Sequence, residues 1–263
     1  MTDDERYLFD LNGYLILRDV LSSEEVKLCN DAIDHHGDQL KERDETLAGG
    51  SGPLSGTSRR IDIGGMLSWE RPWCEPFREF LVHPNVKPHL DSILGERYRL
   101  DHGPGLIAMN EGAEGGTLHG GGVERPNLVE AYFFKDGRIY TGLTVVEYML
   151  ADEGPGDGGV AVIPGSHKAN LRCPESMVRY EDYREHVLEI NAKAGDAVIF
   201  TETLTHGTLP WKGKHQRRAL LYKFSPGYLS YGIGHHEVSF PDYFEDMTED
   251  QRSVMEPPHI RRP

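Results

Sequence analysis

The sequence predicts an all-β core with flanking helices, arranged as a double-stranded β-helix, or jelly roll. Helical periodicity dominates up to about residue 95, and short strand-like runs separated by turns dominate from 97 to about 226. A length of 263 residues is ordinary for one such β-sandwich. We therefore expect one domain with N-terminal helices at about 1–95, a jelly-roll core at about 97–226 and a C-terminal helical tail at about 238–263.

Four helices are predicted in the first part of the chain, at residues 3–11, 22–40, 75–81 and 86–94. The second follows a capping box, because Ser22 and Glu25 have the spacing in which each caps the other's backbone. Gly95 ends the last of them in the C-cap role. A further amphipathic helix is expected at 242–255.

Nine strands are predicted, at residues 14–17, 98–101, 106–110, 131–134, 139–150, 160–163, 187–190, 197–200 and 218–223. Alternating or β-branched apolar residues indicate most of them. Asp136-Gly137 is a hairpin signal between two of them. Helices followed by a run of short strands favour a jelly roll with helices on one face.

Composition and charge narrow the classes of partner. The formal net charge of −15 at pH 7 repels phosphate backbones and anionic membranes, so we expect no nucleic-acid partner. No apolar run reaches membrane-spanning length, and no secretory signal is apparent, so we expect a cytoplasmic protein without membrane association. Three scattered cysteines are expected to be inert thiols. The oligomeric state is left open.

The strongest chemical signal lies in residues 195–223, where a predicted loop between two strands carries His206. An imidazole nitrogen is a suitable ligand for Fe, Zn, Cu or Ni. Arg217 or Arg218 begins the next strand and can bind a carboxylate at two points. His119, among glycines that allow a ligand to approach closely, is the expected partner of His206. Together these residues suggest an iron site that uses an organic-acid cosubstrate.

Four stretches carry a resemblance to a known family: residues 9–18, the glycine-rich stretch around His119, residues 158–168 and residues 195–218. In this order and at these separations they resemble the phytanoyl-CoA dioxygenase family of Fe(II)/2-oxoglutarate oxygenases. The resemblance implies a cupin-like jelly roll, a small-molecule substrate, Fe(II) as cofactor, and 2-oxoglutarate and O₂ as cosubstrates.

The resemblance also implies roles for individual residues. His119 matches the first iron ligand of the family, and His206 matches the distal one. Arg217 matches the arginine that binds the 2-oxoglutarate carboxylate, with Arg218 as the neighbouring alternative. Thr208 is expected to add a hydroxyl donor to that carboxylate.

One position departs from the family pattern. The family has Asp or Glu two residues after the first histidine, whereas this chain has Gly121, which has no side chain to bind iron. A carboxylate from elsewhere would restore the site, and Glu124 and Glu202 are the nearest candidates. Of these, Glu202 is expected to act beside the ligands rather than as one of them. Alternatively a halide or water occupies the position, or the redox chemistry has been lost.

We therefore predict an Fe(II)/2-oxoglutarate-dependent dioxygenase that hydroxylates a small molecule and releases succinate and CO₂. The first alternative is a 2-oxoglutarate-dependent halogenase, in which chloride occupies the space beside Gly121. The second is a non-catalytic, cupin-like protein that binds a small molecule. The identity of the substrate is left open, because a fold supports many chemistries.

Overall fold

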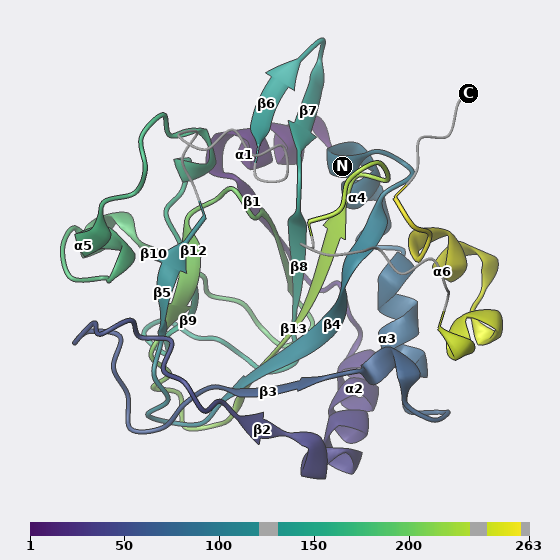
Figure 1. The fold of residues 1–263 in the computed structure, drawn as a ribbon, viewed down its shortest axis with the longest axis horizontal. Coiled ribbons are helices and arrows are strands. Elements are labelled where there is room, and N and C mark those ends of the chain that lie inside the picture. Colours follow the sequence, from purple (N-terminus) through teal and green to yellow (C-terminus); the bar gives the residue numbers. More distant parts are fainter. Residues whose placement is uncertain (121–130, 232–240, 259–263) are drawn as a thin grey trace.

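The computed structural model describes residues 1–120, 131–231 and 241–258. Two antiparallel sheets face each other, and helices pack against the outer face of the larger one (Figure 1). This arrangement confirms the predicted fold class, a jelly roll with flanking helices. Among the described residues, no helix has the length and apolar character needed to cross a membrane.

The larger sheet has seven strands, in the spatial order β1 (Tyr14–Leu17), β11 (Ala197–Thr201), β8 (Thr144–Met149), β13 (Arg217–Ser225), β4 (Arg99–Met109), β3 (Ile61–Gly64) and β2 (Lys41–Glu42). Three of these strands come from the part of the chain before residue 97, where mainly helices were expected. β1 matches its predicted range, and it pairs with β11 so that Tyr14 lies opposite Phe200. Residues 98–101 and 106–110, predicted as two strands, form the single strand β4.

The smaller sheet has four strands, in the order β10 (Leu188–Glu189), β9 (Gly159–Val162), β12 (His206–Leu209) and β5 (Gly116–His119). β6 (Tyr132–Lys135) and β7 (Arg138–Thr141) form a separate hairpin at the predicted Asp136-Gly137 turn (Figure 1). The sequence predicted a loop where β12 lies, and that prediction was wrong; no strand was predicted where β5 lies. Their glycines resemble turn residues, but each strand gains its hydrogen bonds from a partner distant in the sequence.

The helices are α1 (Asp3–Asn12), α2 (Ser23–His35), α3 (Glu75–Glu79), α4 (Lys87–Leu94), α5 (Glu175–Val178) and α6 (Glu249–Val254). The capping box at Ser22 and Glu25 is present at the start of α2. This helix ends at His35, before the predicted residue 40, because His36 leaves the helical conformation and a short 3₁₀ turn follows. The predicted helix at 242–255 is likewise split into a 3₁₀ segment, Asp242–Asp246, and α6.

The central strands β8 and β11 of the larger sheet are buried on both faces, because their side chains alternate between two cores. Val145 and Met149 of β8 face the smaller sheet. Tyr148 of β8 and Tyr222 of β13 face the helices, and the Tyr222 hydroxyl donates a hydrogen bond to the carbonyl of Phe77 at 2.6 Å. The sheet is thus held between helices and the smaller sheet, and the space between the two sheets contains the predicted site residues.

Candidate active site

His119 and His206 lie opposite each other on the paired strands β5 and β12. Their ring centroids are 4.2 Å apart. Nδ1 of His206 lies 2.7 Å from the carbonyl oxygen of Leu204, and Nδ1 of His119 lies 3.3 Å from that of Thr117. A carbonyl oxygen can only accept a hydrogen bond, so Nδ1 of each ring carries the hydrogen and donates that bond. Nε2 of each neutral ring is then free to bind a metal.

Glu202 supplies a third donor atom beside the two histidines. It lies on the connection of residues 202–205, which leads from β11 in the larger sheet to β12 in the smaller one. Its Oε1 is 3.9 Å from Nε2 of His119 and 3.9 Å from Nε2 of His206. The ligating atoms of the three residues all lie within 4.8 Å of one another. The expectation that Glu202 would act only beside the ligands is not favoured by this geometry.

Gly120 allows the end of β5 to lie against this connection. Its φ of +83° is a conformation that favours glycine. A Cβ at this position would lie 2.4 Å from the carbonyl oxygen of Glu202 and 2.6 Å from that of Leu204. The glycine at 120 therefore permits the approach of the carboxylate-bearing turn to His119. The other expected carboxylate, Glu124, and Gly121 lie outside the described residues.

The ionisation states of the site suit a divalent cation. Burial lowers the pKa of His206 to about 4, with a further contribution from His119, so the ring is neutral at pH 7. Burial alone would raise the pKa of Glu202, but His206, Lys223 and His119 outweigh it and hold that pKa below its usual value. Nζ of Lys223 lies 3.3 Å from Oε2 of Glu202. One carboxylate oxygen therefore faces the lysine while the other faces the histidines.

A cavity of about 560 Å³ opens at these side chains. Its lining includes His119, His206 and Thr208 from the smaller sheet, and Leu221 and Lys223 from the larger one. Further along, β3 and β4 contribute the polar residues Asp62 and His102, and Arg60 lies just before β3. Arg60 and Asp62 form an ion pair with 2.8 Å between Nε and Oδ1. A larger cavity of about 940 Å³ near α4 and β7 is lined by none of the predicted site residues.

Arg217 and Arg218 point in opposite directions from β13. Arg217 is buried between the sheets, where its Nη2 lies 2.6 Å from Oε1 of Glu147 and its Nε lies 2.7 Å from Oε1 of Glu153. Arg218 faces α2, and its Nη2 lies 2.6 Å from Oδ1 of Asp34. Of the two arginines, only Arg217 is directed toward the interior, next to the cavity-lining residue Glu147.

The guanidinium of Arg217 has donor capacity that its two carboxylate partners leave unused, and one of those partners has a perturbed pKa. Nη1 of Arg217 is buried and has no hydrogen-bond partner among the described residues. Burial raises the pKa of Glu153 to about 7, and repulsion by Glu147 adds to this effect although Arg217 opposes it. The pair of carboxylates thus does not use the full donor capacity of the guanidinium.

Comparison with protein families matches residues 9–219 to the family model described as phytanoyl-CoA dioxygenase. Comparison with curated protein sequences gives no significant match.

Several solved structures share the fold. HygX from Streptomyces hygroscopicus with nickel, 2-oxoglutarate and hygromycin B bound has a TM-score of 0.70 at 18% identity, covering 99% of this chain and 98% of that one. HygX with iron bound has a TM-score of 0.70 at 18% identity and covers 99% and 97%. SnoN, a non-haem α-ketoglutarate-dependent epimerase from nogalamycin biosynthesis, has a TM-score of 0.60 at 14% identity and covers 86% and 83%.

Proposed function

This chain belongs to the phytanoyl-CoA dioxygenase family, and on that premise we propose that it hydroxylates a small molecule at a site built from His119, Glu202 and His206. It is an Fe(II)/2-oxoglutarate-dependent oxygenase, as the family match indicates. The observation that carries the proposed site is the convergence of the three side chains, with Oε1 of Glu202 3.9 Å from Nε2 of each histidine.

The donor set fits iron. Two imidazole nitrogens and one carboxylate oxygen are the ligands of the facial triad in non-haem Fe(II) oxygenases. Deprotonated Glu202 and neutral His206 are the forms that bind a cation. Bound there, iron would supply the redox chemistry by which O₂ and 2-oxoglutarate are converted, with release of succinate and CO₂.

The protein's own groups orient these donors. The carbonyls of Leu204 and Thr117 accept hydrogen bonds from the Nδ1–H groups, and each Nε2 is thereby turned toward the site. Lys223 holds Oε2 of Glu202, which leaves Oε1 directed at the histidines. The site would therefore need little rearrangement of its side chains when the metal binds.

The far carboxylate of 2-oxoglutarate is assigned to Arg217. Its buried Nη1 has no partner among the described residues, and a carboxylate oxygen would satisfy it. Thr208 and Glu147, the ion-pair partner of Arg217, line the cavity, and Thr208 offers a hydroxyl donor there. The cavity volume of about 560 Å³ lies in the range of small-molecule sites. The hygromycin B held by HygX supports a small-molecule substrate, although it does not identify the substrate of this chain.

Glu202 favours hydroxylation over halogenation. A halogenase needs an open position for chloride in place of the third protein ligand, whereas here a buried carboxylate faces both histidines. Family membership argues equally against a protein that only binds a small molecule.

The proposal is tested by adding Fe(II) and 2-oxoglutarate to the metal-free protein under anaerobic conditions, with and without chloride. We expect Fe(II) binding that His206→Ala lowers by one equivalent per chain, a metal-to-ligand absorption band that chloride does not shift, and 2-oxoglutarate turnover once O₂ is admitted. His206→Ala should abolish the band. A chloride-dependent shift would instead favour halogenation, and turnover that survives His206→Ala would refute the proposed site.

A further inference from the structure

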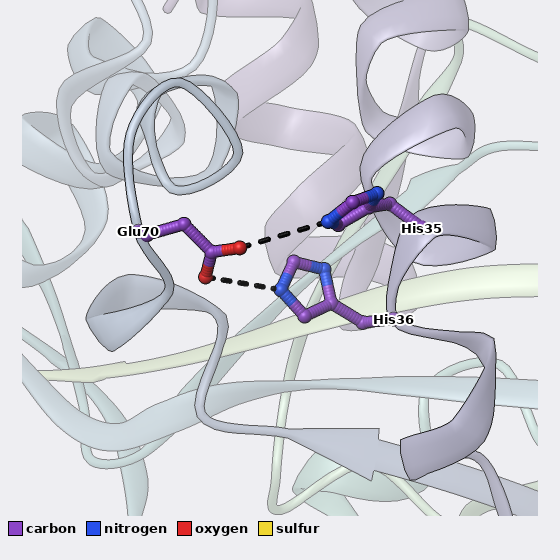
Figure 2. Close-up of side chains that lie close together, drawn as sticks. All are labelled: His35, His36 and Glu70. Carbon is purple, nitrogen blue, oxygen red and sulfur yellow. Dashed lines mark hydrogen bonds and ion pairs between the residues drawn. The ribbon is translucent and has the colours of Figure 1, made fainter.

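A second cluster of metal-ligating side chains lies outside the active site, at the end of α2. His35 and His36 turn toward Glu70, which follows the 3₁₀ segment Met66–Ser68 (Figure 2). We propose that these three residues bind a divalent transition-metal cation of the Zn²⁺ type. The site shares no residue with the proposed iron site and does not depend on the proposed reaction.

The spacing of the donor atoms suits a tetrahedral ion. Nε2 of His35 lies 3.6 Å from Oε1 of Glu70, and Nε2 of His36 lies 3.5 Å from Oε2. The ligating atoms of the three residues all lie within 4.8 Å of one another. Two ligands that are each about 2.1 Å from a tetrahedral Zn²⁺ lie about 3.4 Å apart. A cation between the rings and the carboxylate therefore requires only small movements of the side chains.

The hydrogen bonding of His36 leaves a lone pair facing the carboxylate. Nδ1 of His36 lies 2.8 Å from the carbonyl oxygen of Ala32, which can only accept, so Nδ1 carries the proton. In the neutral ring Nε2 is then an acceptor, and it faces a second acceptor, Glu70. A cation between them removes this repulsion. A histidine that donates its other ring proton to a backbone carbonyl is also the usual arrangement of a metal ligand.

Both rings are held in place before any metal binds. His36 stacks on Trp69 with centroids 3.9 Å apart and planes at 8°, and His35 stacks on Trp73 at 4.3 Å and 18°. Adjacent residues inside a helix point in different directions, but α2 ends here, which lets both rings reach Glu70. The carbonyl end of a helix also attracts positive charge. Preorganised ligands lose little side-chain entropy on binding.

Zn²⁺ binding to the full-length, metal-free protein tests the inference, with the iron site removed by His119→Ala together with His206→Ala. Isothermal titration calorimetry should show two Zn²⁺ ions bound per chain in the wild-type protein and one in this double variant. Adding Glu70→Gln to the double variant should weaken the remaining site about tenfold or more. The matched control is His186→Gln in the same double variant, which should leave the Zn²⁺ affinity unchanged. His186 is also an exposed histidine beside a carboxylate, with 3.8 Å between its Nε2 and Oε1 of Glu185.

A stability measurement separates metal binding from a simple ion pair. Zn²⁺ should raise the melting temperature of the double variant, because the ion joins the end of α2 to the segment before α3. Glu70→Gln should remove this rise while leaving the metal-free melting temperature almost unchanged, since Glu70 is exposed. A double variant that binds no Zn²⁺, or one whose binding is insensitive to Glu70→Gln, would overturn the inference and leave His35 and His36 as ion-pair partners of Glu70.

Discussion

Oε1 of Glu202 lies 3.9 Å from Nε2 of His206, although the residues between them carry the chain from one sheet to the other. In a regular strand, residues four positions apart would be too distant for their side chains to meet. The turn between the sheets brings this carboxylate and imidazole together. The proposed iron site depends on this turn, because Gly121, two residues after His119, has no side chain to bind a metal.

Glu202→Ala should remove the third ligand and weaken Fe(II) binding about 100-fold or more, because changes even outside the ligand set cost about 10- to 100-fold in metal affinity. Anaerobic Fe(II) titration and 2-oxoglutarate turnover would measure the loss. Glu175→Gln, a change at an exposed carboxylate, is the control. Iron affinity unchanged in Glu202→Ala would show that another group completes the site.

Lys223→Met should weaken iron binding about tenfold while leaving the fold intact, because Glu202 loses the cation that orients its Oε2 and favours its ionised form. Lys223→Arg keeps the charge and should retain most of the affinity. The comparison uses the Fe(II) dissociation constant of the two variants. Equal affinity in both would mean that Lys223 does not orient the carboxylate.

Arg217→Lys and Arg218→Gln should have different effects on 2-oxoglutarate. A lysine provides no fork for the carboxylate, so Arg217→Lys should raise the dissociation constant about tenfold or more. Arg218 is directed at Asp34 of α2, so Arg218→Gln should leave that constant nearly unchanged. Binding is measured by the absorption band of the anaerobic complex. The opposite ranking would move the cosubstrate to Arg218.

The affinity for 2-oxoglutarate should fall as the pH rises through about 7. Burial raises the pKa of Glu153 to about 7. Below that pH Glu153 is protonated and Arg217 faces one carboxylate, whereas above it two carboxylates surround the guanidinium and repel a third. The dissociation constant should therefore increase by at most about tenfold per pH unit. Glu153→Gln should remove the dependence, and its persistence in that variant would assign the titration to another group.

Stability should decrease between pH 6.5 and pH 4 because of His167. Burial lowers the pKa of this histidine to about 4, while its usual value is 6.5. In this interval the unfolded chain binds a proton at His167 and the folded chain does not, so the free energy of unfolding falls by up to about 3 kcal/mol. Denaturant titrations of the wild type and His167→Gln would measure this. Identical pH slopes in the two proteins would contradict the prediction.

Local signals in the sequence sufficed for much of the fold. The capping box of Ser22 and Glu25 identified the start of α2, and the turn signal Asn12-Gly13 followed by an apolar run identified β1 at its observed bounds. Both signals lie within a few residues of the element they specify. The ends of α2 and of the C-terminal helix were less predictable, because the conformation of His36 and the 3₁₀ turn of Asp242–Asp246 depend on packing.

The candidate site was predictable only in part. Motif spacing identified His119 and His206, which lie on adjacent strands. The strands that carry them were missed, because their hydrogen bonds come from partners distant in the sequence. The position of Glu202 depends on a turn between two sheets and on the close approach at Gly120, which no local pattern specifies. A carboxylate four residues before the distal histidine was the available signal.

Two of the proposed ligands, Glu202 and His206, are only four positions apart in the sequence. One short segment therefore supplies both of them. A chain that brings its acidic ligand on this turn no longer requires one beside His119. The residues after His119 are then free to diverge toward substrate selection without loss of metal. With Glu202 as the proposed ligand, substitutions after His119 would change the cavity without removing a metal ligand.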